Sequence, residues 1–476
     1  MAISKSWAWS WSLISFLNLA LFRVAAAGGH PLPIVHKDVV ILGGGASGTY
    51  AAIRLREDYG KSVLLVEMEA VLGGHVNTYI IPETGEAFNY GVQSYIDYKG
   101  AKAFFQSFGI PLQPNVLFSS NTVLIDPSTG GIVTNAPAPP PLNESIAALQ
   151  KYHDVIAPWD DIQLPGYWNF PRGNQIPADL LLPFADFVKK YGLEAMAPIL
   201  NIVSGQSIST TDPTMFVVRN FGTPVVEGFL QNTFFDPVPF NNSLLYEAAG
   251  RLLGADVALT STIVQADRSN PGGGVRLVVE NLQTLARTVV VAKRLLVASP
   301  PSVENLASLG LDAQEKTVFR RSFTFLTVYT ATLKTNLIPE NTSVAFTGLI
   351  NSTYSFSLTW NGVLGYFWVI FFSEVLLSKA ETSQVILTEM AALSQSGALP
   401  PPMGETPNSE VVSISNHSQV TWGPSVQQIK DGFVQDLYAL QGHRDTWYTG
   451  GLWCPDYSSN VWAFTDTVLP KLLRGI

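Results

Sequence analysis

The chain has one cysteine, Cys454, and only six histidines among its 476 residues. An intramolecular disulfide is therefore excluded, and a metal site made of clustered cysteine and histidine ligands is not expected. Charged residues make up only 14% of the chain, and its formal net charge is −9, with no cluster of basic residues. A nucleic-acid partner is not expected, because phosphate backbones are bound by clustered lysine and arginine.

The chain also lacks an apolar run long enough for a stable membrane span. Its longest N-terminal run, residues 13–22, is shorter than the about 20 residues that a spanning helix needs, and Arg23 ends it. Lys5 precedes this run and three alanines, residues 25–27, follow it. This pattern predicts a cleavable signal peptide over residues 1–27 and a location in the secretory pathway, either extracellular or in a vesicular or vacuolar lumen.

Five N-x-S/T sequons agree with that route and predict a glycoprotein. They begin at Asn143, Asn241, Asn341, Asn351 and Asn416. Hydrophobic residues make up 47% of the chain, and a length of 476 residues predicts two or three domains at about 150 residues each.

Residues 38–67 have the pattern of a βαβ unit. Apolar runs at 37–42 and 62–67 predict two buried strands, and apolar residues at helical spacing lie between them. Gly43, Gly45 and Gly48 form a G-x-G-x-x-G turn after the first strand, and Glu67 ends the second. Such a turn lets backbone N–H groups approach a pyrophosphate, and the acid is placed to bind ribose hydroxyls. The sequence therefore predicts dinucleotide binding, with Ala46 and Ser47 at the phosphate-binding start of the helix.

Periodicity predicts further elements outside this unit. Helices are expected over 178–191 and 244–253. Strands are expected over 257–265, 275–280, 288–291 and 295–298, and a hairpin is expected over 354–371 with its turn at Asn361-Gly362.

Motifs after the βαβ unit resemble, in order, those of the flavin-containing amine oxidoreductase superfamily. They are the segments 67–75, 88–91, 257–266, 295–301 and 448–451. The resemblance implies FAD, with further contacts from Gly74, His75, Gly91, Ile263, Gly450 and Gly451. It also implies an α/β fold, in which residues 36–115, 240–301 and 430–476 form a discontinuous Rossmann-like FAD-binding domain. Residues 116–239 and 302–429 would form an inserted α+β mixed-sheet substrate domain.

Three details are similar to the fungal β-cyclopiazonate dehydrogenase family: Gly73-Gly74-His75, residues 178–184, and Trp453, Asp456, Ser458-Ser459 and Trp462 near the C-terminus. This resemblance implies oxidation of a small, largely apolar substrate by hydride transfer to flavin, with molecular oxygen as electron acceptor, in secondary metabolism.

Three departures from the superfamily pattern affect these expectations. His75 replaces an arginine that neutralises the pyrophosphate, Gly451 replaces an acid that contacts the ribityl chain, and residues 322–331 lack the lysine of amine oxidases. Amine oxidase activity, a prenylcysteine-oxidase-like activity, and a non-catalytic FAD-fold binding protein or secreted structural glycoprotein remain alternatives.

Several single residues allow two interpretations each. His75 can bond FAD covalently or hydrogen-bond to it, and Cys454 can attach to flavin or be a small buried hydrophobe. Trp360, Tyr366 and Trp368 can form a wall for an aromatic substrate, although sheet packing explains their alternation equally well. No residue is identified as the general base.

Overall fold

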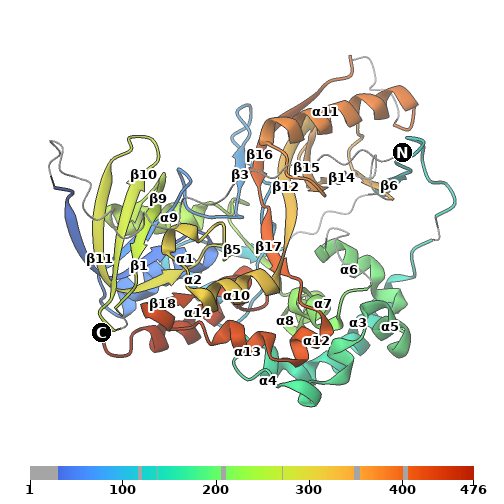
Figure 1. Ribbon diagram of the computed structural model, residues 1–476. Coiled ribbons are helices and arrows are strands. Elements are labelled where there is room, and N and C mark those ends of the chain that lie inside the picture. The colour runs from blue at the N-terminus through green and yellow to red at the C-terminus, as the bar shows by residue number, and fades with distance from the viewer. Residues whose placement is uncertain are drawn as a thin grey trace, which may run out of the picture.

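The computed structural model describes residues 31–115, 121–136, 138–204, 211–270, 272–347, 354–399 and 406–476 (Figure 1). The expected signal peptide and the sequon at Asn351 lie outside these residues. Within them, no helix combines the length and the apolar character that crossing a bilayer requires.

The first sheet is built on the predicted βαβ unit. β1 (Ile34–Leu42) pairs in parallel with β2 (Val63–Val66), and α1 (Ala46–Ile53) connects the two strands. β1 also pairs in parallel with β11 (Arg287–Val297) on its other side. Val39, Val40 and Ile41 of β1 are fully buried. Burial on both faces of the sheet explains why this strand is a continuous apolar run.

The other strands extend this sheet in the order β8-β2-β1-β11-β10-β9, and β18 (Thr446–Tyr448) pairs with the C-terminal end of β11. Their bounds are Val257–Ala258 for β8, Ser261–Asp267 for β9 and Val275–Asn281 for β10. The single strand predicted over 257–265 is two strands, because Thr260 has a left-handed φ of 48° and turns the chain from β2 towards β10. The two strands predicted over 288–298 are one continuous strand, β11.

The second sheet has the order β16-β12-β15-β14-β13-β6, with β17 also pairing with β12. Only β13 and β6 pair in parallel among its described strands, so the sheet is mixed, as predicted. The bounds are Asn121–Ile125 (β6), Phe323–Thr335 (β12), Thr342–Phe346 (β13), Tyr354–Trp360 (β14), Tyr366–Ser373 (β15), Ser409–Asn416 (β16) and Gln419–Trp422 (β17). The predicted hairpin is present between β14 and β15. α11 (Lys379–Ser396) covers one face of this sheet (Figure 1).

The first insert is largely helical, and it lies below the second sheet in Figure 1. Its helices are α3 (Leu142–Ile156), α4 (Asp160–Gln163), α5 (Phe184–Tyr191), α6 (Ala197–Ser204), α7 (Thr214–Asn220) and α8 (Thr223–Gln231). The single helix predicted over 178–191 is wrong. A 3₁₀ turn, Ala178–Leu181, is followed by extended Leu182, and α5 begins after Pro183. A proline disfavours helical backbone at the preceding residue, which explains the break.

The remaining described elements are short hairpins and helices around the first sheet. They are β3 (Thr78–Ile80), β4 (Ala87–Asn89), α2 (Ala101–Ser107), β5 (Leu112–Pro114), β7 (Phe235–Pro237), α9 (Leu244–Leu253, as predicted), α10 (Ala313–Ser322), α12 (Val426–Lys430), α13 (Phe433–Tyr438) and α14 (Ser458–Leu472). The indole N–H of Trp462 in α14 donates to the carbonyl of Ala46 at 3.1 Å and fixes α14 against the start of α1.

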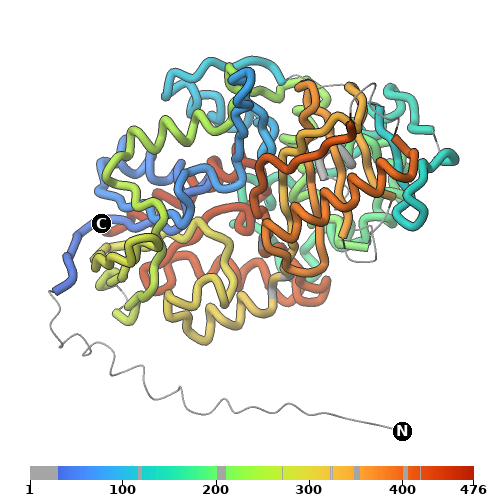
Figure 2. The backbone as a smooth tube through the Cα atoms, turned by 90° about the horizontal axis from the view of Figure 1, so that it is seen from above, coloured from blue at the N-terminus to red at the C-terminus, as the bar shows by residue number. Residues whose placement is uncertain are grey.

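Two hydrophobic cores divide the molecule. The first sheet shares one continuous core with the helical insert, where Phe187 and Phe221 pack with the same cluster as Val40 and Leu296. The second sheet and α11 have a separate core. Figure 2 shows the strands of the second sheet, in orange, beside the part of the molecule that carries the first sheet.

Candidate functional site

A cavity of about 2680 Å³ lies where the first sheet, the second sheet and the helical insert meet. This volume exceeds the roughly 300–1,000 Å³ of a pocket for one drug-sized ligand, so it can hold a dinucleotide together with a substrate. Thirteen of the expected site residues line it: Gly43, Gly45, Ala46, Ser47, Glu67, Gly74, His75, Gly91, Ile263, Trp360, Trp368, Gly450 and Gly451. Gly48 and Tyr366 are not among the lining residues.

The two glycine segments of the first sheet lie against each other at the cavity wall. A Cβ on Gly74 would lie 2.9 Å from the Cα of Gly45, whereas a Cβ on Gly45 would meet no described protein atom nearer than 3.7 Å. Gly48 has a different role, because a Cβ there would lie 1.8 Å from the carbonyl oxygen of Gly43. No side chain caps α1 at Gly45, so its first N–H groups remain available to an anion. This arrangement fits a pyrophosphate.

Glu67 stabilises the glycine turn and also faces the cavity. Its Oε2 accepts the N–H of Gly44 at 2.6 Å, and its Oε1 accepts the N–H of Glu69 at 2.8 Å. Burial raises the pKa of this carboxyl group, against the opposing effect of these backbone hydrogen bonds. Each carboxylate oxygen can accept more than one hydrogen bond, so ribose hydroxyls can still bind there.

His75 stacks on His417, a residue that the sequence did not single out. The ring centroids are 4.4 Å apart and the ring planes are inclined by 19°. His417 Nε2 lies 2.6 Å from Oδ1 of Asn77, which can only accept, so Nε2 carries the proton. Enclosure by protein lowers the pKa of His75, and the charge of Asp456 partly offsets this. Burial also holds the pKa of His417 well below its usual value. His75 therefore presents a neutral imidazole to the cavity.

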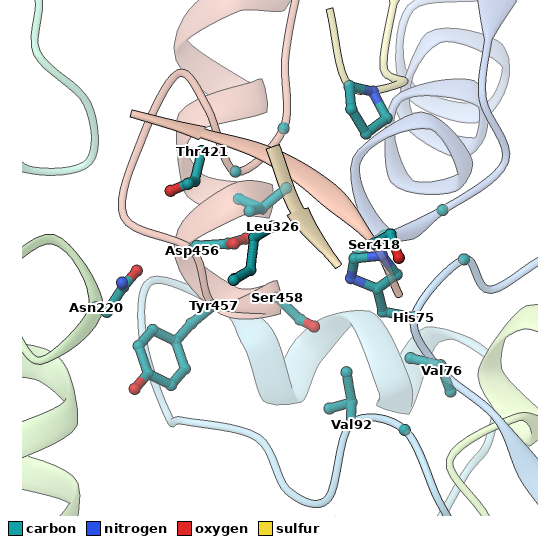
Figure 3. Close-up of a pocket in the computed structure, with 18 of the residues that line it drawn as sticks. His75, Val76, Val92, Asn220, Leu326, Ser418, Thr421, Asp456, Tyr457 and Ser458 are labelled. Carbon is teal, nitrogen blue, oxygen red and sulfur yellow. The ribbon is translucent and has the colours of Figure 1, made fainter. Parts of the chain in front are cut away.

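The C-terminal segment brings an acid to the place where Gly451 lacks one. A Cβ on Gly451 would lie 2.0 Å from Oδ1 of Asp456, so the carboxylate of Asp456 fills the space of the missing side chain. Asp456 lines the cavity directly before α14 (Figure 3). No side chain caps α14, and its first N–H groups are also available to a ligand.

Cys454 is fully buried and is not a lining residue. Its thiol lies 3.5 Å from the carbonyl oxygen of Gly450, to which it donates, and burial raises its pKa well above the usual value. These features agree with a small buried hydrophobe and give no route from the sulfur to the cavity.

The proposed aromatic wall needs one correction. Trp360 and Trp368 line the cavity, and the indole N–H of Trp368 donates to the carbonyl of Tyr90 at 3.0 Å. Tyr366 is 5% exposed and packs with Phe88, at a ring separation of 6.2 Å, over the β3–β4 hairpin. Alternation places Tyr366 on the same face of β15 as Trp368, but at the end of the strand, where the hairpin covers it.

The cations at the cavity differ from those expected of an amine oxidase. β12 extends beyond the predicted strand and includes Lys334, whose Nζ is 2.5 Å from Oε1 of Glu83. Lys334 does not line the cavity, whereas Lys379 of α11 and Arg219 of α7 do. Neither Lys379 nor Arg219 belongs to a recognisable sequence motif, so sequence reasoning did not find them.

One cluster of possible metal ligands, Asp312, Glu315 and His443, lies outside the cavity lining. Arg268 and Glu315 form an ion pair of 2.7 Å with both side chains fully buried, and Arg444 Nη1 is 3.3 Å from the same carboxylate. Asp312 accepts from His443 at 2.6 Å. These bonds describe an ion-pair network rather than an open metal site.

A Rossmann-like sheet with this glycine cradle, joined to a mixed sheet over one shared cavity, defines the fold of the flavin-dependent amine oxidases. Residues 41–108 match the NAD(P)-binding Rossmann-like domain. The structure is similar to a fatty acid isomerase from P. acnes, with a TM-score of 0.70 at 15% identity over 92% of this chain and 99% of that chain. It is also similar to a putrescine oxidase double mutant, with a TM-score of 0.62 at 16% identity over 93% and 100% of the two chains.

Full-length relatives define the family more closely. The chain is 32% identical to FAD-dependent oxidoreductase pigF of Monascus ruber over 94% of both chains. It is 29% identical to β-cyclopiazonate dehydrogenase of Aspergillus flavus over 97% of this chain and 98% of that protein. The chain belongs to the family of FAD-dependent oxidoreductases that includes β-cyclopiazonate dehydrogenase, so it is an enzyme and its cofactor is FAD.

Proposed function

We propose that this enzyme oxidises a small, largely apolar substrate by hydride transfer to FAD, that molecular oxygen is the electron acceptor, and that the reaction belongs to secondary metabolism. The observation that carries the proposal is the continuity of the cavity, because one space joins the glycine cradle to an aromatic wall. That wall includes Phe216, Phe221, Phe229, Phe234, Trp360, Trp368 and Trp422.

The residues on the page fit FAD without rearrangement. Gly45 and Gly74 leave room for a pyrophosphate beside the free N–H groups of α1, and Glu67 lies where the ribose would be. The start of α14 and Asp456 lie further along the same wall. Bound FAD supplies the two-electron acceptor, while the aromatic wall holds an apolar molecule and excludes water from the place of oxidation.

Anaerobic titration tests the proposal directly. The purified protein is expected to be yellow and to bleach when an apolar substrate from a panel is added without oxygen. Admission of air is expected to restore the colour and produce hydrogen peroxide. A protein that bleaches but regains colour only with an added quinone or dye would contradict oxygen as acceptor. A flavoprotein that no compound reduces would favour a non-catalytic binding protein.

Amine oxidase activity is the second candidate, since the fold is shared with putrescine oxidase. The position of Lys334 argues against it, because this lysine is paired with Glu83 away from the cavity. Primary and secondary amines in the same panel separate the two candidates. Bleaching by amines at rates above those for neutral apolar compounds would favour the amine oxidase, and bleaching by a prenyl thioether would favour the prenylcysteine-oxidase-like alternative.

We also propose that the enzyme passes through the secretory pathway, with residues 1–27 removed. Three sequon asparagines, Asn143, Asn341 and Asn416, are exposed and accessible to a glycosyltransferase. Asn241 is only 8% exposed, and its side-chain oxygen accepts the N–H of Ser243 at 2.9 Å. Peptide mass spectrometry after expression in a eukaryotic host is expected to find glycans at the exposed sites but not at Asn241. A retained N-terminus and no glycans would contradict the proposal.

A further inference from the structure

Arg219 is a buried cation at the cavity that the fold itself does not explain. It lies on α7 between two features of the cavity wall, and only 5% of the residue is exposed. Its Nη2 donates to the carbonyl oxygen of Gly451. The guanidinium also lies over the ring of Trp422, 5.1 Å from the ring centroid. Arg219 thus joins the C-terminal flavin segment to the aromatic wall.

The guanidinium has much less compensation than its burial requires. Among the described residues no carboxylate oxygen lies within 4.0 Å of it, and its Nε is buried without a hydrogen-bond partner. Arg268 shows the usual solution, because its buried guanidinium forms two hydrogen bonds with Glu315, of 2.7 and 3.0 Å. A buried charge held by one carbonyl is costly unless a further group completes it. That group must be an oxygen of a bound molecule.

The surroundings of Arg219 indicate which molecule this is. The pyrophosphate cradle is formed by other residues, at Gly45, Gly74 and the start of α1. Arg219 instead has Phe216, Phe221 and Trp422 as neighbours along the cavity lining. A planar guanidinium set among aromatic rings suits a molecule with an apolar body and one acidic oxygen group.

We propose that Arg219 anchors the substrate, and that the substrate class is an apolar small molecule carrying a carboxylate or an ionised enol. The inference rests on the proposed function, since it specifies the substrate of the same cavity. The acidic group lies on Arg219, and the apolar body extends along the aromatic wall. Arg219 therefore selects acidic compounds over neutral compounds of the same shape.

A pair of matched probes tests the anchor without turnover. The holoenzyme is titrated with 4-phenylbutanoate and with its neutral amide, 4-phenylbutanamide, and binding is followed by the change in flavin absorption. The wild type is expected to bind the carboxylate roughly tenfold or more tightly than the amide, as a hydrogen bond to a charged group allows. Arg219→Gln is expected to lose this preference, with amide affinity and flavin content unchanged.

Three further variants make the result specific. Arg320→Gln removes an exposed arginine of α10 and is expected to behave as wild type. Lys379→Gln removes the other cavity cation and is expected to keep most of the preference. If Arg219→Gln does not fold, Arg219→Lys serves in its place, because it keeps the charge but not the planar donor geometry. It is expected to bind the carboxylate several-fold more weakly than wild type, and unchanged affinity would overturn the proposal.

Other outcomes also overturn it. These are equal binding of the two probes or no binding of the carboxylate by the wild type, an unchanged preference in Arg219→Gln, and loss of the preference in Lys379→Gln instead. Loss of FAD from Arg219→Gln would assign the residue to the cofactor. A wild-type protein that binds the carboxylate through Arg219 but is reduced by no substrate keeps the anchor and rejects the proposed oxidation, so the two failures are distinguishable.

Discussion

Gly45 and Gly74 meet back to back, with 2.9 Å between the Cα of Gly45 and the position that a Cβ on Gly74 would take. The residues belong to different turns of the first sheet, one before α1 and one after β2. Their contact gives the cavity a wall of bare backbone, which is what a pyrophosphate needs in order to approach main-chain N–H groups.

Gly45→Ala is expected to fold normally and to be mostly colourless. The new methyl group would touch the protein only at 3.7 Å, but it would enter the space of the pyrophosphate. Gly48→Ala is the matched comparison, because its Cβ would lie 1.8 Å from the carbonyl oxygen of Gly43 and should destabilise the fold itself. Thermal unfolding and the flavin-to-protein absorbance ratio distinguish the two effects. Full flavin occupancy in Gly45→Ala would contradict the cradle.

Glu67→Ala is expected to weaken FAD binding by roughly 1.5 to 3 kcal/mol, the range for a hydrogen bond to a charged group. The substitution removes the acceptor for ribose and also the acceptor for the N–H of Gly44. The rate of FAD dissociation, followed by the fluorescence of released flavin, gives the size of the effect. Glu144→Ala, at an exposed acid of α3, is the control. Equal dissociation rates in both variants would remove Glu67 from the site.

Exchanging residues 451 and 456 tests whether Asp456 supplies the acid that Gly451 lacks. Gly451→Asp alone is expected to lose flavin, because the new side chain collides with a carboxylate 2.0 Å from its Cβ. Asp456→Gly alone is expected to bind FAD more weakly, by roughly 1 to 3 kcal/mol. The double variant removes the collision and restores an acid, so its flavin retention should exceed that of both single variants. A double variant as poor as Gly451→Asp would show that the acid has no role there.

Acid denaturation determines how the flavin is held. We expect precipitation with acid to release free FAD into the supernatant, since glycine N–H groups, Glu67 and packing provide non-covalent contacts. Yellow colour that stays with the polypeptide would contradict this. The carrier would then be His75, because Cys454 is buried and bonded to Gly450. Peptide mapping of the flavin would identify the residue.

The stacked histidines predict a loss of stability in acid. The pKa of His417 is held well below its usual value in the folded protein, whereas in the unfolded chain it is ordinary. Below about pH 6.5 the unfolded state therefore binds more protons, and stability falls as the pH falls. The melting temperature of wild type should decrease between pH 7.5 and 5.5 more than that of His417→Gln. Equal decreases would show that this ring does not contribute.

The parts of the site that the sequence predicted are those that are contiguous in the chain. Gly43, Gly45 and Glu67 lie within one βαβ unit, whose local geometry fixes their positions. His417 bonds to Asn77, which is 340 residues away, and no local pattern encodes such a contact. Asp456 was noted only as part of a C-terminal motif, because nothing in its spacing shows that its carboxylate turns back onto Gly451.

Two errors have simple physical causes. The helix expected over 178–191 relied on apolar spacing and gave too little weight to Pro183, which fixes the start of α5. Tyr366 was placed in the aromatic wall because alternation reports the face of a strand. It does not report how far along the strand the cavity extends, and the β3–β4 hairpin covers that end.

The division into two hydrophobic cores has a consequence for how this enzyme can change. Arg219 belongs to the body that holds the cofactor, whereas Trp360 and Trp368 stand on a sheet with its own interior. Substitutions in β14 and β15 can therefore reshape one side of the cavity while the flavin and the anchor beside it keep their mutual positions. Substrate range and redox chemistry are in this way separable properties of the same chain.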